Sequence, residues 1–252
     1  MSQYPAPPRI LSIAGSDSSG GAGIQADIKT ITMLGGFAMT AITAITAQNS
    51  LGVTAVHALS PAMVAAQIDA CVSDIGVDAV KIGMLGSAEI AGVVADRLEA
   101  LGKPVVFDPV MIATSGSVLA DAETISAFER LMALATLTTP NVPELGALGG
   151  DKAMALRGVS YLAKGGDAPG EIVIDRLIRP HSQDIEWTAP RITTPHSHGT
   201  GCTLSSAIAV GLGRGEDLVA AIERARDYVR RALLAAPGFG AGHGPMGHQA
   251  VR

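Results

Sequence analysis

The run His198–Ser206 (HGTGCTLSS) has residue types and spacings that suit the binding of an anion. Two glycines flank Thr200, and apolar residues follow at helical spacing, which predicts a glycine-rich turn leading into a helix. The first N–H groups of a helix have no acceptor inside it, and the helix dipole adds positive charge to them. The turn formed by Gly199, Thr200 and Gly201 is therefore a candidate anion site. A tight loop before a buried helix would give the same pattern.

Cys202 directly follows this turn and is a candidate base. Positive charge at a helix N-terminus favours the thiolate of a cysteine, so we expect this thiol to ionise readily. A small residue of the core is the alternative interpretation. The other cysteine, Cys71, shares a predicted helix face with Val64 and Ile68 and is expected in the core. The spacing of the two cysteines fits neither a metal site nor a disulfide framework.

Several predicted strands end in side chains that could bind a metal ion or a phosphate. Asp108 ends an apolar strand, and Asn141 and Glu144 open a short helix. Side chains three residues apart share a helix face, so these two can both reach a hydrated Mg²⁺. Turn and capping roles account for the same residues. Lys164, which precedes two glycines, is either a phosphate contact or an ordinary solvated lysine.

Two further polar residues lie near predicted strand ends. Gln48 ends a long strand rich in β-branched residues, and its amide can donate and accept side by side, as the edge of an aminopyrimidine requires. An ordinary turn residue is the alternative. Asp27 lies in the first turn of a predicted helix, where the helix dipole stabilises a carboxylate.

The order of the predicted elements supplies a scaffold for these candidates. An apolar strand at 9–14 leads into a glycine-rich loop and a helix, and at least five strands end in a glycine-containing or acidic loop before a helix. This repetition predicts one α/β domain with a mostly parallel sheet and helices on both faces. Segments 171–178 and 184–192 are expected to form an antiparallel hairpin at a sheet edge. The loop spacing matches neither a dinucleotide fingerprint nor a Walker loop.

Composition narrows the classes of function. The 252 residues are 48% hydrophobic and carry a net charge of −5 without a basic run, which argues against nucleic acid as a partner. The uncharged stretch 30–68 is rich in β-branched residues, so buried strand is favoured over a membrane helix. Residues 1–8 are expected to be a flexible lead-in without a signal peptide, which favours a cytoplasmic protein. The glycine-rich tail 238–252 is either disordered or folded over a ligand.

Seven motifs, in order along nearly the whole chain, resemble those of the hydroxymethylpyrimidine and phosphomethylpyrimidine kinases of thiamine biosynthesis. They are AGSDSSGGAGIQAD (14–27), AQN (47–49), KIGML (81–85), DPVM (108–111), TPNVPE (139–144), KGG (164–166) and HGTGCT (198–203). The resemblance implies a ribokinase-like three-layer α/β/α sandwich, a homodimer, and ATP and Mg²⁺ as cofactors. It also implies phosphorylation of 4-amino-5-hydroxymethyl-2-methylpyrimidine to its monophosphate and then to the diphosphate.

The resemblance also implies roles for single residues. The pyrimidine pocket would be formed by Gly15, Ala22, Asp27, Gln48, Met84 and Val110. Asp108, Glu144 and Asn141 would hold Mg²⁺ and its waters, while Asn141, Lys164 and Thr200 would contact the nucleotide. Gly199, Thr200 and Gly201 would form the anion hole, and Cys202 would take the proton of the substrate hydroxyl.

Three departures from the family pattern concern the nucleotide side. Thr114, in a predicted lid at 112–117, stands where relatives often carry a lysine; the segment between Glu144 and Lys164 is short; and the tail lacks a lysine near Ala241. A pyridoxal or pyridoxine kinase is the nearest alternative. Relatives of that kind can use a lid cysteine, and 112–116 has none, which favours the pyrimidine. A catalytically silent pyrimidine-binding regulatory protein is the alternative from another class.

Overall fold

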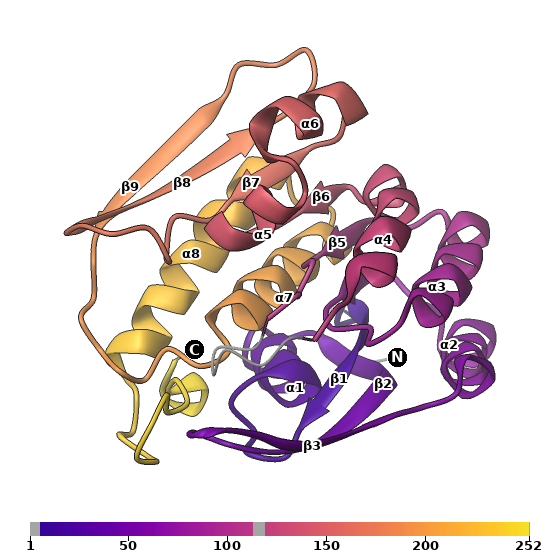
Figure 1. The fold of residues 1–252 in the computed structure, drawn as a ribbon, viewed down its shortest axis with the longest axis horizontal. Helices are drawn as coiled ribbons and strands as arrows, with labels where there is room; N and C mark the ends of the chain where they lie inside the picture. The colour runs from indigo at the N-terminus through magenta and orange to yellow at the C-terminus, as the bar shows by residue number, and fades with distance from the viewer. Residues whose placement is uncertain (1–5, 113–118, 252) are drawn as a thin grey trace.

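In the computed structural model, which describes residues 6–112 and 119–251, one nine-stranded sheet forms the middle layer between helices (Figure 1). The strand order is β3-β2-β1-β4-β5-β6-β7-β8-β9. The predicted three-layer α/β/α architecture is confirmed. Apart from Ile112, the predicted lid lies outside the described residues, as does Thr114.

Six neighbouring strands of the sheet run parallel. They are β2 (Phe37–Asn49), β1 (Arg9–Asp17), β4 (Ala79–Ile82), β5 (Val105–Phe107), β6 (Leu137–Thr138) and β7 (Tyr161–Ala163). Antiparallel strands continue the sheet on both sides, namely β3 (Gly52–Ala58) beside β2, and β8 (Ile172–Ile178) and β9 (Ile185–Pro190) beyond β7. The predicted edge hairpin is therefore confirmed as β8 and β9.

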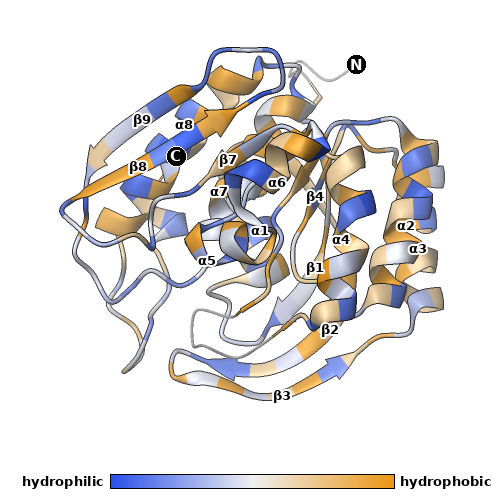
Figure 2. Ribbon diagram, turned by 45° about the horizontal axis from the view of Figure 1, so that its top comes forward, coloured by the Kyte–Doolittle hydropathy of each residue, from blue (hydrophilic) through white to orange (hydrophobic). Residues whose placement is uncertain are grey.

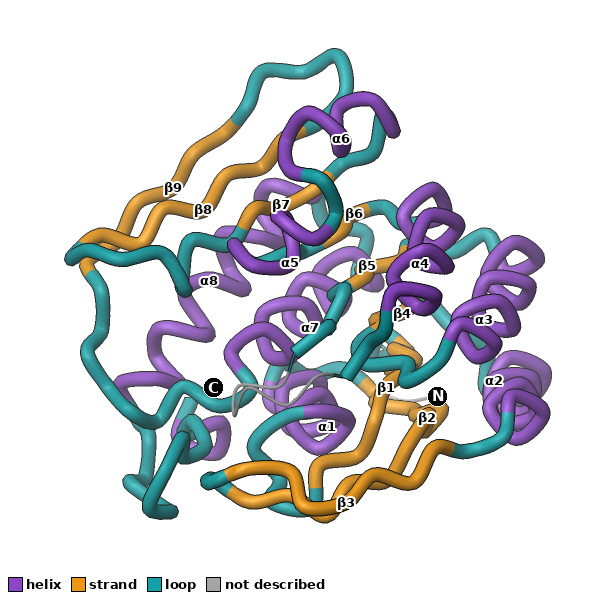
Figure 3. Tube along the Cα trace, in the orientation of Figure 1, coloured by secondary structure: helices purple, strands orange, loops and turns teal. Residues whose placement is uncertain are grey.

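Helices cover both faces of the sheet (Figure 3). One face packs against α1 (Gly23–Met33), α7 (Thr200–Gly213) and α8 (Leu218–Leu234). The other carries α2 (Pro61–Asp74), α3 (Ala88–Leu101), α4 (Ala122–Leu134), α5 (Val142–Ala147) and α6 (Gly150–Arg157). Hydrophobic and hydrophilic residues alternate along α2, α3 and α4, as expected of helices with one buried side (Figure 2).

Alternation along the central strands divides the core into two parts. In β5, Val105 and Phe107 face the core of α2–α6, whereas Val106 faces the core of α1, α7 and α8. A strand covered on both faces must be apolar throughout, which is why these short segments read as uninterrupted hydrophobic runs. None of the described helices is both long and apolar enough to span a bilayer.

The glycine-rich tail folds against the body of the protein. Its backbone N–H groups at Gly242 and His243 bond to the hydroxyl and carbonyl oxygens of Ser50, in the β2–β3 turn. Further along, Met246 and Val251 are buried, and a short 3₁₀ helix, η1 (His248–Ala250), packs near α1. The structure therefore places tail residues against the body of the protein, and a tail that covers a ligand stays a prediction.

Candidate active site

A cavity of about 960 Å³ opens where the parallel strands end. It is lined by all but one of the predicted site residues: Gly15, Ala22, Gln48, Met84, Asp108, Val110, Asn141, Glu144, Lys164, Gly199, Thr200, Gly201 and Cys202. Carboxyl ends of parallel strands meet at one edge of a sheet, so the ends of β1 and β2 and the loops after β1, β4, β5, β6 and β7 bring most of these residues together. The others, Gly199 to Cys202, reach the cavity from the turn before α7. The volume is large enough for a nucleotide and a small ring.

The turn before α7 has free N–H groups, as predicted. Gly199 adopts a left-handed conformation with φ of 85°, and an added Cβ would lie 1.9 Å from the carbonyl oxygen of Gly21. No side chain caps the helix. Among the described residues, the N–H groups of Gly201 and Cys202 have no acceptor. Both residues line the cavity, so these groups are available to an anion there.

Cys202 differs from the expectation of a readily ionised thiol. Burial raises the pKa of Cys202 to about 11, and the negative charges of Asp27 and Asp108 also raise it. The positive charge of Lys81 and the N–H of Gly23, which bonds to the sulfur, lower it less. Desolvation thus outweighs the helix terminus, and at neutral pH the resting protein holds a thiol.

An acidic pair and a lysine occupy the cavity beside the anion turn. Lys164 Nζ lies 2.7 Å from Asp108 Oδ1 and 3.9 Å from Glu144 Oε2. Thr139 donates to the same Asp108 oxygen at 2.9 Å. A Cβ added at Gly201 would lie 3.2 Å from both Asp108 Oδ2 and Lys164 Nζ, so glycine lets the helix terminus approach this cluster closely.

Asn141 and Glu144 hold each other in a capping box at the start of α5. Asn141 Oδ1 accepts from the Glu144 N–H at 2.9 Å, and Glu144 Oε2 accepts from the Asn141 N–H at 2.8 Å. Both the capping role and a place at the cavity are therefore found in the same residues. Burial raises the pKa of Glu144 to about 7, with a further increase from Asp108, while Lys164 lowers it.

The carboxylates present fit a hydrated Mg²⁺ better than a metal held by protein alone. In the described part of the chain, no three His, Cys, Asp or Glu side chains converge on one point. Mg²⁺ commonly takes one or two carboxylates and completes its shell with water and substrate phosphates. Asp108 and Glu144 offer that number, and Lys164 lies beside both carboxylates.

Another part of the cavity, here called its apolar end, is lined by apolar side chains. Met84 and Val110 line it beside Gly15 and Ala22. A Cβ at Gly15 would lie 2.4 Å from the Met84 methyl group, so this glycine makes room for the methionine. An apolar wall of this kind suits the face of a flat ring.

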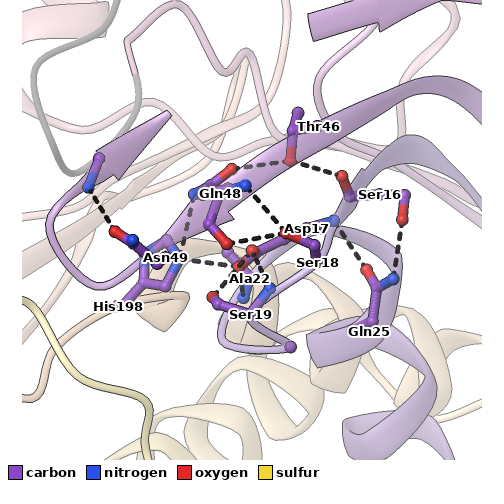
Figure 4. Close-up of polar contacts among 12 residues, drawn as sticks. Ser16, Asp17, Ser18, Ser19, Ala22, Gln25, Thr46, Gln48, Asn49 and His198 are labelled. Carbon is purple, nitrogen blue, oxygen red and sulfur yellow. Dashed lines mark hydrogen bonds and ion pairs between the residues drawn. The ribbon is translucent and has the colours of Figure 1, made fainter. Parts of the chain in front are cut away.

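Gln48 is tied to a group of polar side chains at this end (Figure 4). Its amide lies 3.1 Å from Thr46 Oγ1 and 3.2 Å from His198 Nε2, which in turn lies 2.8 Å from Asp17 Oδ2. Asp17 and His198 are buried, and both line the cavity. Sequence analysis assigned no place in the ring pocket to His198 or Asp17, since nothing local links residues 181 positions apart.

Asp27 is the one predicted pocket residue that does not line the cavity. Its carboxylate is completely buried, with an ion pair to Lys81 at 2.9 Å. Ser12 and Ser206 also donate to it, at 2.6 and 2.8 Å. Because its oxygens are already bonded to other side chains, the direct substrate contact expected of Asp27 does not match this geometry.

A second apolar region of the cavity was missed by sequence reasoning. It is lined by Val173, Ala189, Val229 and Leu233, with Arg226 nearby. These residues come from β8, β9 and α8. The four apolar ones have the type and spacing of ordinary core residues, so no local signal marks them. His243 of the tail also lines the cavity. It lies close in sequence to Ala241, near which relatives often carry a lysine that this chain lacks.

Comparison with known proteins agrees with this geometry. The chain matches the family described as phosphomethylpyrimidine kinase over residues 17–247. The hydroxymethylpyrimidine/phosphomethylpyrimidine kinase of Rhizobium meliloti (strain 1021) is 45% identical over 255 residues, covering 94% of this chain and 96% of the relative.

Solved structures show the same ribokinase-like fold. An ADP complex of Bacillus subtilis pyridoxal kinase has a TM-score of 0.89 at 32% identity, covering 97% of this chain and 98% of that one. The phosphomethylpyrimidine kinase from Clostridium difficile 630 has a TM-score of 0.74 at 38% identity, covering 89% and 98%. The match over residues 17–247 and the 45% identity to a full-length relative show that this chain belongs to the phosphomethylpyrimidine kinase family.

Proposed function

We propose that the protein transfers a phosphoryl group from ATP to 4-amino-5-hydroxymethyl-2-methylpyrimidine and then to its monophosphate. One observation carries the proposal: the turn before α7 touches both ends of a single cavity. His198 contacts Gln48 at the apolar end, and Gly201 lies beside Asp108 and Lys164 at the charged end. A ring bound at Gln48 would thus present its hydroxymethyl group to a phosphate bound at the turn.

The residues divide the work of phosphoryl transfer between them. Gln48, Met84, Val110, Gly15 and Ala22 would hold the ring. The N–H groups of Gly201 and Cys202 would stabilise charge on the transferred phosphoryl oxygens, which supplies most of the catalysis in a reaction of this class. Thr200 and Asn141 would contact the nucleotide.

Metal and charge complete the proposed site. Asp108 and Glu144 would hold Mg²⁺, which when bound would neutralise the phosphate oxygens, and Lys164 would leave Asp108 for a phosphate. The charge of Asp108 raises the pKa of Cys202. If a bound cation neutralised the charge of Asp108, the pKa of the Cys202 thiol would fall. Cys202 could then take the proton of the substrate hydroxyl more readily. We also propose, from family resemblance, a homodimer in the cytoplasm.

ADP release with ATP and Mg²⁺ tests the proposal. We expect activity with the hydroxymethylpyrimidine and with its monophosphate. Pyridoxal is the comparison substrate, since the solved structure with a TM-score of 0.89 is of a pyridoxal kinase. Activity on pyridoxal alone would support that second function. Pyrimidine binding without ADP release would instead indicate the silent regulatory protein.

A further inference from the structure

The hydrogen bonds around Gln48 form a chain whose direction can be determined (Figure 4). Asp17 Oδ2, His198 Nε2, the Gln48 amide and Thr46 Oγ1 follow one another at distances of 2.8, 3.2 and 3.1 Å. Thr46 Oγ1 also donates to the carbonyl oxygen of Ser16 at 2.8 Å. Thr46 and Gln48 are two residues apart in β2, so both point from the same face of the strand.

Asp17 determines where His198 carries a proton. Burial by itself would raise the pKa of Asp17, but the hydrogen bonds from His198, Ser19 and Ala22 outweigh burial and lower it. The side chain is thus an ionised carboxylate, which can only accept. A nitrogen 2.8 Å from it must donate, so His198 Nε2 carries a hydrogen whether the ring is neutral or charged.

This proton determines which atom of the Gln48 amide faces His198. Figure 4 draws the Gln48 nitrogen toward His198 Nε2 and the Gln48 oxygen toward Thr46 Oγ1. A Gln48 N–H cannot bond to a nitrogen whose one hydrogen already goes to Asp17, so we assign the amide the other way round. Its oxygen then faces His198 Nε2 and shares that hydrogen with Asp17. The amide nitrogen then faces Thr46 Oγ1, whose own hydrogen goes to Ser16 and whose lone pair can accept. Exchanging oxygen and nitrogen leaves the shape of the amide unchanged and gives every donor in the chain an acceptor.

The ring of His198 is held from several sides. Its backbone N–H bonds to the Gly244 carbonyl oxygen at 3.2 Å, within a short bridge to the tail at Pro245. On its other side, a Cβ added at Gly21 would lie only 2.4 Å from His198 Cδ2. The ring is therefore packed between the glycine-rich loop and the tail, and little freedom remains for it to follow a rotating amide.

One donor and one acceptor of Gln48 remain for a ligand. A carboxamide has two N–H groups and two lone pairs, and the chain uses one of each. We infer that His198 is a positioning residue that fixes the order of donor and acceptor on Gln48, and so selects a 4-aminopyrimidine over its 4-oxo counterpart. The oxo ring has the same shape but presents a ring N–H and an oxygen in the reverse order. This inference rests on the proposed function.

The test compares the 4-amino substrate with the 4-oxo ring that keeps its hydroxymethyl and methyl groups. For each ring we measure kcat/KM with ATP and Mg²⁺, and the binding constant by calorimetry. The wild type is expected to prefer the amino ring strongly. In His198→Leu the preference should fall at least tenfold through a raised KM for the amino ring, with the KM for ATP unchanged.

Three further variants separate positioning from general damage. His198→Gln can return an N–H near the position of Nε2 and should keep the preference within about threefold of the wild type. His57→Leu, the same substitution at an exposed histidine of β3, should behave as the wild type. Thr46→Val keeps the shape of the threonine side chain but removes the hydroxyl that faces the Gln48 amide. This variant should also weaken the preference for the amino ring.

The outcomes distinguish this inference from the proposed function. An unchanged preference in folded His198→Leu and Thr46→Val overturns the role of His198. If His198→Leu does not fold, Thr46→Val and His198→Gln decide. A wild type that phosphorylates neither pyrimidine contradicts the proposed function, and the binding constants for the two rings still test the order of donor and acceptor. A wild type that binds both rings equally well also overturns the inference.

Discussion

Cys202 shows how burial changes the chemistry that a residue type suggests. Its position at a helix N-terminus was predicted correctly, as was its place in the cavity. The expected ease of ionisation was wrong, because loss of water around the thiol outweighs the helix terminus and the charge of Lys81. Burial depends on the whole fold, and no pattern within nine residues reports it.

The pKa of Cys202 makes a direct prediction for the free protein. Only the thiolate reacts with iodoacetamide, so alkylation of Cys202 should be slow at pH 7 and rise about tenfold per pH unit until the pH nears 11. Mass spectrometry of the peptides would follow Cys202 and Cys71 separately. A rate that levels off below pH 8 would show that the helix terminus dominates after all.

Replacing Cys202 tests its role in turnover. Cys202→Ala should reduce kcat at least a hundredfold, because general-base catalysis contributes about 10²–10⁴-fold. Pyrimidine affinity should stay nearly unchanged, since the ring is held by other residues. Steady-state kinetics and calorimetry measure the two quantities. A kcat near that of the wild type would exclude Cys202 from the mechanism.

The side-chain partners of Asp27 and His198 could not be predicted from the sequence. Both were recognised as residues near the site, from a helix first turn and a glycine motif. Their partners lie far away in the sequence: Lys81 is 54 residues from Asp27, and Asp17 is 181 residues from His198. Pairings at such distances follow from the strand order, so they were accessible only once the sheet was known.

The elements themselves were largely predictable. Parallel strands buried on both faces leave an apolar run, and the helices between them have caps that the sequence shows, such as Ser60, Ser87 and Asp121. Strand ends were less certain. Asp108 was expected to end its strand, but β5 already ends at Phe107, because Asp108 turns its side chain to Thr139 and Pro109 has no N–H for a ladder.

The start of α7 depends on glycine at one position. Gly199→Ala would place a methyl group 1.9 Å from a backbone oxygen of Gly21 and force a left-handed conformation on alanine. We expect a loss of at least about 1–3 kcal/mol in the free energy of unfolding, and reduced turnover because the N–H groups move. Urea unfolding and ADP release measure the two effects.

Gly92 provides the matched control. It lies inside α3 with no atom within 4 Å of an added Cβ, so Gly92→Ala should raise stability by up to about 1 kcal/mol and leave turnover unchanged. The two substitutions are chemically identical and differ only in conformation and surroundings. Equal effects in the two variants would show that the close approach of Gly199 to Gly21 does not hold the turn.

At the scale of the whole molecule, a buried ion pair connects the sheet to two helices beneath the cavity. Lys81 of β4 and Asp27 of α1 are completely buried, and Ser12 of β1 and Ser206 of α7 donate to the same carboxylate. Burial alone would lower the pKa of Lys81, but the charge of Asp27, the charges of other acidic neighbours such as Asp108 and the hydrogen bond to Asp27 together outweigh burial and raise this pKa. Lys81 therefore stays charged at neutral pH.

Removing one charge of this pair should lower the free energy of unfolding more than removing both charges. Lys81→Met leaves the Asp27 carboxylate buried without its cation, and we expect a loss of about 3–5 kcal/mol in the free energy of unfolding. The double variant Asp27→Asn with Lys81→Met carries no charge. The amide oxygen at position 27 can accept from one of the two hydroxyls of Ser12 and Ser206, and the amide NH2 can donate to the other, so this variant should recover most of that loss. Urea unfolding at pH 7 compares the wild type, both single variants and the double variant. Independent, additive effects would mean that the two side chains are not coupled as a pair, since only coupled charges make the second substitution compensate for the first.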